Sequence, residues 1–187
     1  MSVRVIAGSA KGRRLAVPTG KHVRPTSDRA RETLFNVLAP RIAGARLLDV
    51  FAGSGAVGIE AISRGAAAVA FVESSRRTIT VLRANIELCG FRERAEVIAR
   101  PWAAGLRDLA GHGERFDIVF CDPPYDWQGA GDCLSALVDG SLLAEGGVAV
   151  IEHRRATPPE AGPGWELQRR LDVGDTSFSL FGIISAT

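Results

Sequence analysis

The apolar residues of this chain fall into short runs that alternate with segments of helical periodicity. Residues 116–121 are apolar at almost every position, which is typical of a strand buried on both faces of a sheet. Residues 75–89 carry apolar side chains every three or four positions, which is typical of an amphipathic helix. These patterns predict strands at 45–52, 67–73, 95–100, 116–121 and 147–153, and helices at 56–64, 75–89, 102–110 and near 132–143.

The two ends of the chain carry different patterns. Near the start, Thr26 or Ser27 can cap a helix, and Pro40 lies just past its expected end. Near the other end, a Gly-Asp-Thr turn separates two strand-like segments. We therefore predict a small hairpin at 3–7 and 14–17, a helix from Asp28 to about Leu38, and an antiparallel hairpin at 165–173 and 177–184.

Strands that alternate with helices predict an α/β fold with a Rossmann-like, mostly parallel sheet that ends in an antiparallel hairpin. We predict two units: residues 1–40 form an N-terminal hairpin and helix extension, and residues 41–187 form the main domain. In such sheets ligands bind beyond the carboxyl ends of the strands. Candidate site residues are therefore sought at those ends.

A glycine-rich turn follows the first predicted strand of the main domain. Gly53 and Gly55 tolerate positive φ and allow a ligand to approach the backbone closely. The segment also satisfies GxGxxG, which alone is weak support for a dinucleotide site. Asp49 changes this interpretation, because an acid before the turn suits the amine of a methionine group better than a pyrophosphate. Glu73 ends the next strand, where it suits ribose hydroxyls of either kind of nucleoside ligand.

Asp122-Pro123-Pro124-Tyr125 follows the predicted strand at 116–121. The prolines cannot extend the hydrogen-bonding ladder of a sheet, so they fix a turn at the strand end. A carboxylate, a rigid carbonyl and an aromatic ring then lie close together, a set that can accept hydrogen bonds from an exocyclic amine and stack on its ring. The tetrapeptide resembles the (D/N)PP(Y/F/W) motif of amino-group methyltransferases. A strand end followed by a proline-rich turn is the alternative, and the presence of Asp49 favours the methyltransferase.

Composition indicates a compact globular enzyme. Hydrophobic residues make up 46% and charged residues 24% of the chain, both ordinary values. Cys89, Cys121 and Cys133 form neither a CxxC pair nor a metal-ligand spacing, so we predict reduced thiols and no metal site. No signal-peptide pattern and no apolar run near the ~20 residues of a membrane span is present. We expect a cytoplasmic protein without membrane contact.

Positive charge is concentrated near the start of the chain. Residues 1–46 contain ten Lys or Arg and two acids, a net charge of +8, whereas the whole chain carries only +2. Such a segment favours contact with a polyanion through counterion release, although a solvated basic terminus would look the same. The candidate nucleic-acid contacts are Arg4, Lys11, Arg13, Arg14, Arg24, Arg29 and Arg31.

Residues 24–36, RPTSDRARETLFN, resemble the RPTxDRxRExLFN signature of the RsmD-type methyltransferases. Residues 4–15 resemble the N-terminal hairpin of that family, and residues 49–61 resemble its cofactor motif, so the likeness spans essentially the whole chain. Members act on the N2 amino group of one guanine in 16S ribosomal RNA. After the strand at 95–100 the family usually carries a polar or acidic residue, whereas this chain reads Ala99-Arg100-Pro101-Trp102.

The resemblance implies S-adenosylmethionine as cofactor and 16S rRNA in an assembled small subunit as substrate. The oligomeric state stays open, and a monomer is the default expectation. It places Thr26, Phe35 and Asn36 near the cofactor or base, where the alternative roles are helix cap and core. It implies acceptor-site roles for Asp122, Pro123, Pro124 and Tyr125, and cofactor contacts for Asp49, Phe51, Gly53, Ser54, Gly55, Glu73, Ser74 and Trp102.

Two other functions remain open at this point. The first is methylation of adenine N6 or cytosine N4 in DNA, because the same tetrapeptide serves those amines. Only about 60 residues follow Tyr125, which leaves no room for a separate DNA-recognition domain. The second is a nucleotide-binding module without methyl transfer, which would leave the acidic tetrapeptide without a purpose.

Overall fold

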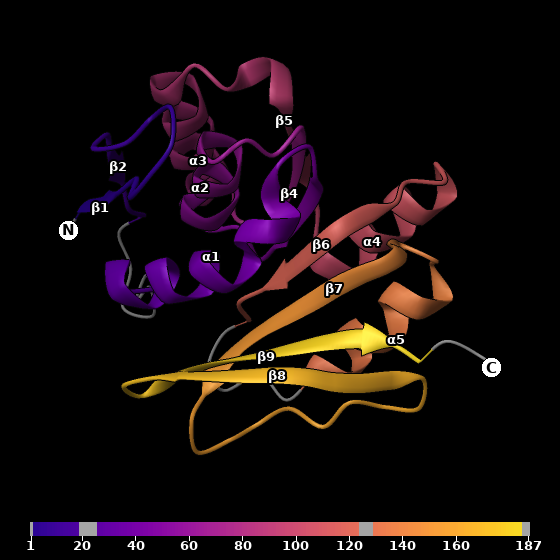
Figure 1. Cartoon of the computed structure of the whole chain (residues 1–187). Coiled ribbons are helices and arrows are strands. Elements are labelled where there is room, and N and C mark those ends of the chain that lie inside the picture. Colours follow the sequence, from indigo (N-terminus) through magenta and orange to yellow (C-terminus); the bar gives the residue numbers. More distant parts are fainter. Residues whose placement is uncertain (1, 19–25, 124–128, 185–187) are drawn as a thin grey trace.

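A seven-stranded sheet forms the centre of the protein in a computed structural model that describes residues 2–18, 26–123 and 129–184 (Figure 1). The five strands from β5 to β7 run parallel, and β9 runs antiparallel to both β7 and β8. Across the sheet the order is β5 (Ala95–Ala99), β4 (Ala68–Glu73), β3 (Arg46–Val50), β6 (Phe116–Cys121), β7 (Leu143–Arg154), β9 (Thr176–Ile183) and β8 (Trp165–Val173).

Helices cover both faces of the sheet. One apolar cluster joins one sheet face to α1 (Asp28–Ile42), α2 (Ala56–Ser63) and α3 (Arg76–Cys89). The other joins the opposite face to α4 (Trp102–Gly111) and α5 (Ala130–Asp139). A short 3-10 helix, η1 (Arg92–Arg94), leads into β5. This arrangement confirms the predicted α/β fold, its mostly parallel sheet and its antiparallel C-terminal strands.

The observed strand ends differ from the sequence expectation where the backbone turns sharply. The strand predicted at 45–52 stops at Val50, because Phe51 adopts a φ of 65° that no strand residue can have. The last parallel strand begins at Leu143 instead of residue 147. Its register with β6 shifts between Phe116 and Ile118, and the extra residues include Gly146 with a φ of 70°.

Two helices also differ from expectation. The helix near 132–143 spans Ala130–Asp139 and is followed by Ser141, whose φ of 50° cannot continue a helix. The first helix continues through Pro40 to Ile42. Pro40 lies in the last turn, where the loss of a single N–H donor is tolerated. The boundary predicted at residue 40 therefore falls inside a continuous helix.

The N-terminal hairpin, β1 (Ser2–Arg4) and β2 (Arg14–Ala16), packs on α2 and α3. The buried Glu60 carboxylate on α2 accepts hydrogen bonds from the backbone N–H groups of Ile6 and Ala7, at 2.7 and 3.0 Å. Asn85 on α3 exchanges two hydrogen bonds of 2.9 Å with the backbone of Ala16. The basic N-terminal segment is thus fixed to the main domain.

Within the described residues, no helix is both long enough and apolar enough to cross a membrane.

Gly58 permits the close approach of α2 to the sheet, and this leads to a stability prediction. A Cβ there would lie 2.3 Å from Phe71 Cε1 and 2.8 Å from Val69 Cγ1, both in the core. We expect Gly58→Ala to lower the free energy of unfolding by about 1–3 kcal/mol, because overpacking displaces core side chains. Urea denaturation measures the change.

Gly111, the last residue of α4, is the matched control, because a Cβ there would meet no atom within 4 Å. We expect Gly111→Ala to leave the urea midpoint unchanged or slightly raised. Equal midpoints for the two variants would contradict the packing role of Gly58.

Candidate active site

The turn after β3 brings an acid and a series of backbone N–H groups together. Gly53 and Gly55 have φ values of 56° and 78°, and Gly55 serves as the N-cap of α2. Asp49 Oδ2 accepts a hydrogen bond of 3.0 Å from the Gly58 N–H in the first turn of α2. A Cβ on Gly55 would lie 2.3 Å from Leu82 Cδ1, whereas one on Gly53 would face open space. The turn is therefore packed on one side and accessible at Gly53.

Asp49 is buried, with 2% of its surface exposed. Burial raises the pKa of Asp49 to about 8, and the negative charge of Glu73 adds to the effect. The hydrogen bond from Gly58 opposes the rise, because it stabilises the ionised form. A cation brought to this carboxyl group would favour its ionisation. The site is thus suited to an amine.

Glu73, at the end of β4, accepts hydrogen bonds from backbone N–H groups of two loops. Its Oε1 accepts hydrogen bonds from the N–H groups of Ser74 and Ser75, at 2.8 and 2.9 Å. Its Oε2 accepts one from Gly53 N–H, at 3.1 Å. A carboxylate has about four acceptor positions, so one on Oε2 stays available to a donor such as a ribose hydroxyl.

Two aromatic rings stand beside these acids. The rings of Phe51 and Trp102 have centroids 6.2 Å apart with planes tilted by 40°, and both residues are half-buried. Trp102 begins α4 directly after Pro101, which occupies the N-cap position. Ser54 is buried, and its carbonyl oxygen accepts a hydrogen bond of 2.9 Å from Asn85. The two rings thus lie together where the chain leaves β3 and β5.

Asp122 and Pro123 follow β6, and both are half-buried. The Asp122 N–H lies 3.5 Å from the carbonyl oxygen of Val50, so the end of β6 stays beside the end of β3. Burial, together with the charges of Glu152 and Asp49, raises the pKa of Asp122 well above its ordinary value. Pro124 and Tyr125 lie outside the described residues.

Glu152 is a fourth acid near these strand ends, and the sequence interpretation missed it. The β6 and β7 register pairs Cys121 with Ile151, so Asp122 and Glu152 follow on the same sheet face. Glu152 is 3% exposed, and its Oε2 accepts a hydrogen bond of 2.6 Å from Thr26 Oγ1. Burial raises the pKa of Glu152 to about 7, against the opposing effects of Thr26 and Arg31. An acid at the end of the neighbouring strand was the signal available in the sequence.

Comparison with known proteins identifies the family. A family model described as conserved hypothetical protein 95 matches residues 3–182. The chain belongs to this family. Ribosomal RNA small subunit methyltransferase D of Haemophilus influenzae is 36% identical over 180 residues, which cover 96% of this chain and 93% of the relative. The protein of the same name from Escherichia coli K12 is also 36% identical over 180 residues, which cover 96% and 89% of the two chains.

A solved structure of the same family supports the fold. The Escherichia coli protein yhhF superposes on this chain with a TM-score of 0.84, at 35% identity and over 100% of both chains. The RsmD-type family predicted from residues 24–36 is therefore confirmed. The match between residues 3 and 182 includes the N-terminal hairpin, so this family member carries its basic segment as part of the family's common length.

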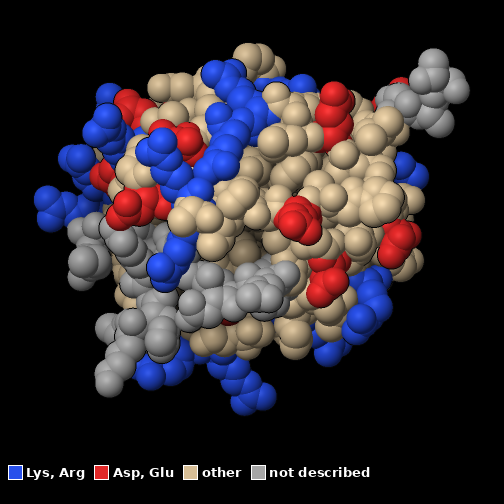
Figure 2. All heavy atoms as spheres, turned by 90° about the horizontal axis from the view of Figure 1, so that it is seen from below, with Lys and Arg blue, Asp and Glu red and all other residues tan. Residues whose placement is uncertain are grey.

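The predicted nucleic-acid contacts lie in different surroundings. Arg4, Lys11, Arg13, Arg14 and Arg29 are exposed, and Arg24 lies outside the described residues. Figure 2 shows Lys and Arg side chains gathered over the left and upper part of the face seen from below, whereas several acids and a few further basic side chains are scattered over the rest. Their role in binding stays a prediction.

Arg31 departs from the expectation of a surface cation, because it is fully buried. Its Nη2 donates to the carbonyl oxygen of Arg4 and to the carboxylate of Asp28. Its Nε and Nη1 have no hydrogen-bond partner among the described residues. Desolvation lowers the pKa of Arg31, and the charges of Asp28, Glu60 and Glu152 oppose this shift. Arg31 therefore acts in the interior, where it contacts the backbone of the hairpin and where the charge of Glu152 acts on it.

Three further residues of the same segment can now be placed. Thr26 is buried against Glu152, and Ser27 rather than Thr26 is the N-cap of α1, accepting from the Ala30 N–H. Phe35 belongs to the core, with none of its surface exposed, and Asn36 is exposed. Thr26 alone of the three predicted near the site contacts one of its acids.

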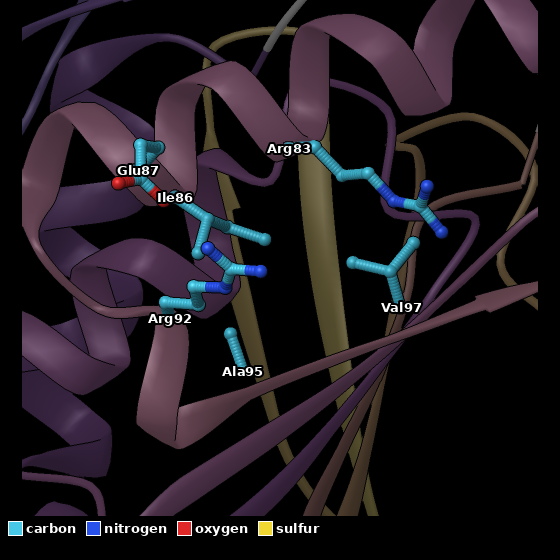
Figure 3. Close-up of a pocket in the computed structure, with 6 residues that line it drawn as sticks. All are labelled: Arg83, Ile86, Glu87, Arg92, Ala95 and Val97. Atoms are coloured by element: carbon cyan, nitrogen blue, oxygen red, sulfur yellow. The ribbon is translucent and has the colours of Figure 1, made fainter.

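A separate pocket lies between α3 and β5 at the outer edge of the sheet (Figure 3). It has a volume of about 380 Å³, and Arg83 and Arg92 project beside an apolar floor that includes Val97. Ala95, the first residue of β5, also lines it, so the pocket lies away from the carboxyl ends of the strands. It is not part of the candidate active site.

The raised pKa of Asp49 makes stability depend on pH. The folded state keeps the Asp49 proton up to about pH 8, whereas the unfolded chain releases it near 3.8. Between these values the folded state binds more protons, so Asp49 reduces stability by about 1.4 kcal/mol for each unit by which the pH rises. We expect Asp49→Asn, which cannot ionise, to flatten the fall in unfolding free energy between pH 5 and 8.

Urea denaturation at pH 5, 6.5 and 8 in the absence of ligand tests this expectation. Asp117→Asn is the control, because Asp117 lies at the exposed start of β6. Parallel pH profiles for wild type and Asp49→Asn would mean that Asp49 is ionised throughout.

Proposed function

We propose that this protein transfers a methyl group from S-adenosylmethionine to the N2 amino group of one guanine in 16S ribosomal RNA, within an assembled small subunit. The observation that carries the proposal is the position of Asp49 and Asp122, on one sheet face at the ends of the adjacent strands β3 and β6. Membership of a family whose named relatives are ribosomal RNA methyltransferases supports the substrate class.

S-adenosylmethionine is the cofactor, and when bound it supplies an electrophilic methyl group on a sulfonium sulfur. The residues around the β3 turn fit its parts. Asp49 is a buried acid suited to the ammonium group, and Glu73 keeps one acceptor position for a ribose hydroxyl. Phe51 and Trp102 offer the adenine an apolar wall. Gly53 leaves room for close approach, since a Cβ there would have only the Phe51 carbonyl oxygen near 4 Å.

Asp122 and Pro123 form the acceptor side of the site. The N2 amine of guanine is a poor nucleophile, because its lone pair is delocalised into the ring. Hydrogen bonds from that amine to the Asp122 carboxylate and the Pro123 carbonyl would favour a more tetrahedral nitrogen. They would also hold the amine nitrogen in line with the S–CH3 bond. Alignment of this kind can lower the activation barrier by about 7–11 kcal/mol. The guanine must leave the base stack to reach these groups.

The proposal is tested by transfer of labelled methyl to three acceptors in parallel. These are small ribosomal subunits that lack the modification, the same RNA freed of protein, and duplex DNA, each followed by nucleoside analysis. N2-methylguanosine from the subunits is the expected product. Label in DNA as N6-methyladenine or N4-methylcytosine would favour the DNA enzyme instead. Cofactor binding without label in any acceptor would favour a non-catalytic module.

Removal of Asp122 and removal of Asp49 are expected to impair different steps of the reaction. Asp122→Ala should lower the rate of methyl transfer by at least about 100-fold, because the acceptor amine loses a contact. The affinity for the cofactor should stay within about twofold of wild type. Asp49→Ala should weaken cofactor binding itself, since the ammonium group loses its counter-charge. Calorimetric titration with S-adenosylmethionine, beside single-turnover methyl transfer, separates the two effects. Exchange of the two phenotypes would show that the two pockets are assigned the wrong way round.

The basic hairpin is expected to contact RNA phosphates. Lys11 and Arg14 are exposed, whereas Arg13 also donates to the Leu88 carbonyl oxygen at 2.7 Å and is left intact. We expect Lys11→Glu with Arg14→Glu to weaken RNA binding and to lower the slope of log affinity against log salt by about 1.5. Filter binding over a range of salt concentrations measures this slope.

Arg107→Glu with Arg115→Glu is the matched control, because both arginines are exposed and Arg107 lies on α4, across the sheet from the hairpin. The control carries the same change in net charge. Equal losses of affinity in the two double variants would assign the effect to overall charge rather than to the hairpin.

A further inference from the structure

Glu152 has a position that the proposed reaction does not yet explain. It lies in β7, two residues before that strand ends, and beside Asp122, which directly follows β6. Both side chains are on the face that α1 covers. Glu152 is almost completely buried, and it forms no ion pair with any residue that the structure describes, which is unusual for an acid. Its carboxylate accepts a hydrogen bond from a neutral hydroxyl group, that of Thr26. Burial of a carboxyl group beside the acceptor residue costs free energy, so a functional role for Glu152 is expected.

The groups that face Glu152 come from four elements. Asp122 on β6 and Asp49 on β3 are acids on the same face of the sheet. Arg31 on α1 is a fully buried cation whose charge acts on Glu152. On β9 the cross-strand partner is Phe178, which carries no charge. The next residue along β7, His153, is hydrogen-bonded through its Nε2 to Ser179 Oγ at 2.9 Å.

The proposed reaction releases a proton close to Asp122. As the N–CH3 bond forms, the S–CH3 bond breaks and its electron pair returns to sulfur. The guanine nitrogen then holds one methyl group and two hydrogens with a positive charge, and it must lose one proton. The carboxylate hydrogen-bonded to the amine is that of Asp122, so this proton passes first to Asp122. Asp122 must then return to its ionised form before the next turnover.

We propose that Glu152 is a positioning residue that acts through Asp122: the two carboxyl groups share protons, and Glu152 takes over the proton that Asp122 receives. This rests on the proposed function. Neighbouring carboxyl groups do not both ionise readily, so an ionised Glu152 has a raised affinity for the proton that Asp122 receives. Arg31 stabilises the negative charge on Glu152 when it gives its proton up, and Thr26 fixes its orientation. The raised pKa values of both acids agree with this arrangement.

The pH profile of single-turnover methyl transfer tests the proposal in the full-length protein with small subunits as acceptor. Glu152→Gln keeps the shape of the side chain but carries no charge and accepts no proton. Asp122 would then ionise without a charged neighbour. We expect the rising limb of the profile to move by about one unit to lower pH, and the plateau rate to fall about tenfold.

Affinity for S-adenosylmethionine should stay within about twofold in Glu152→Gln. Glu166→Gln, an exposed substitution on β8, should reproduce the wild-type profile. A limb that does not move would overturn the proposal and leave Glu152 a structural residue. If the rising limb of the pH profile moves but the plateau rate stays unchanged, the proposed transfer of the proton to Glu152 is wrong. Loss of cofactor affinity would place Glu152 in the cofactor pocket instead.

A second readout does not need turnover. The side-chain carboxyl carbon of Asp122, followed by NMR during a pH titration, should report a lower pKa in Glu152→Gln than in the wild type. Thr26→Val removes the hydroxyl group that orients Glu152, and Thr26→Ser keeps it. We expect the valine variant to lose rate and the serine variant to keep it. Wild-type protein that methylates no acceptor, yet shows the Asp122 shift, would refute the proposed function and leave the carboxyl pair standing.

Discussion

The constraint on which the site depends is the burial of several carboxyl groups at one edge of a parallel sheet. Each acid removed from water must be protonated or must receive donors. Asp49 receives the Gly58 N–H and keeps its proton to about pH 8, and Glu152 receives the Thr26 hydroxyl. Glu73 is less buried and accepts hydrogen bonds from three backbone N–H groups. The turn after β3 and the start of α1 therefore have their present shapes partly because they supply these donors.

The same constraint joins the N-terminal segment to the main domain through hydrogen bonds. Glu60, buried in α2, accepts from Ile6 and Ala7 N–H groups and pairs with Arg64. Arg31 donates a hydrogen bond to the Arg4 carbonyl oxygen, and its positive charge opposes the rise in the pKa of Glu152. The helix α1 that carries Arg31 continues past the expected boundary at residue 40. A basic hairpin that contacts RNA would thus be joined by hydrogen bonds to the helix that lines the acceptor side of the site.

Much of this architecture could be predicted from the sequence, because strand burial and helix periodicity are local signals. The strand-end rule located Asp49, Glu73 and Asp122, which the structure places at the ends of β3, β4 and β6. It failed for Glu152, since an acid between Ile151 and His153 looks like the polar end of a strand. Its partner Thr26 is 126 residues away in the chain, and no local pattern reports such a contact. Arg31 was misread for a related reason: a cation in a basic segment suggests solvent, and only the packed hairpin shows its burial.

The electrostatics of the group suggest how cofactor and acceptor sites communicate. The charge of Asp49 raises the pKa of Asp122, although the two acids would serve different ligands. Asp49 keeps its proton to about pH 8, so this effect applies once Asp49 has ionised. A cofactor ammonium group placed against Asp49 would favour that ionisation and balance the new charge at the same place. Ionised Asp122 is the form that accepts hydrogen bonds from an amine. The cofactor would therefore occupy the Asp49 site without making Asp122 harder to ionise. The adjacency of β3 and β6 at the centre of the sheet makes this coupling possible, since the ends of these strands lie side by side.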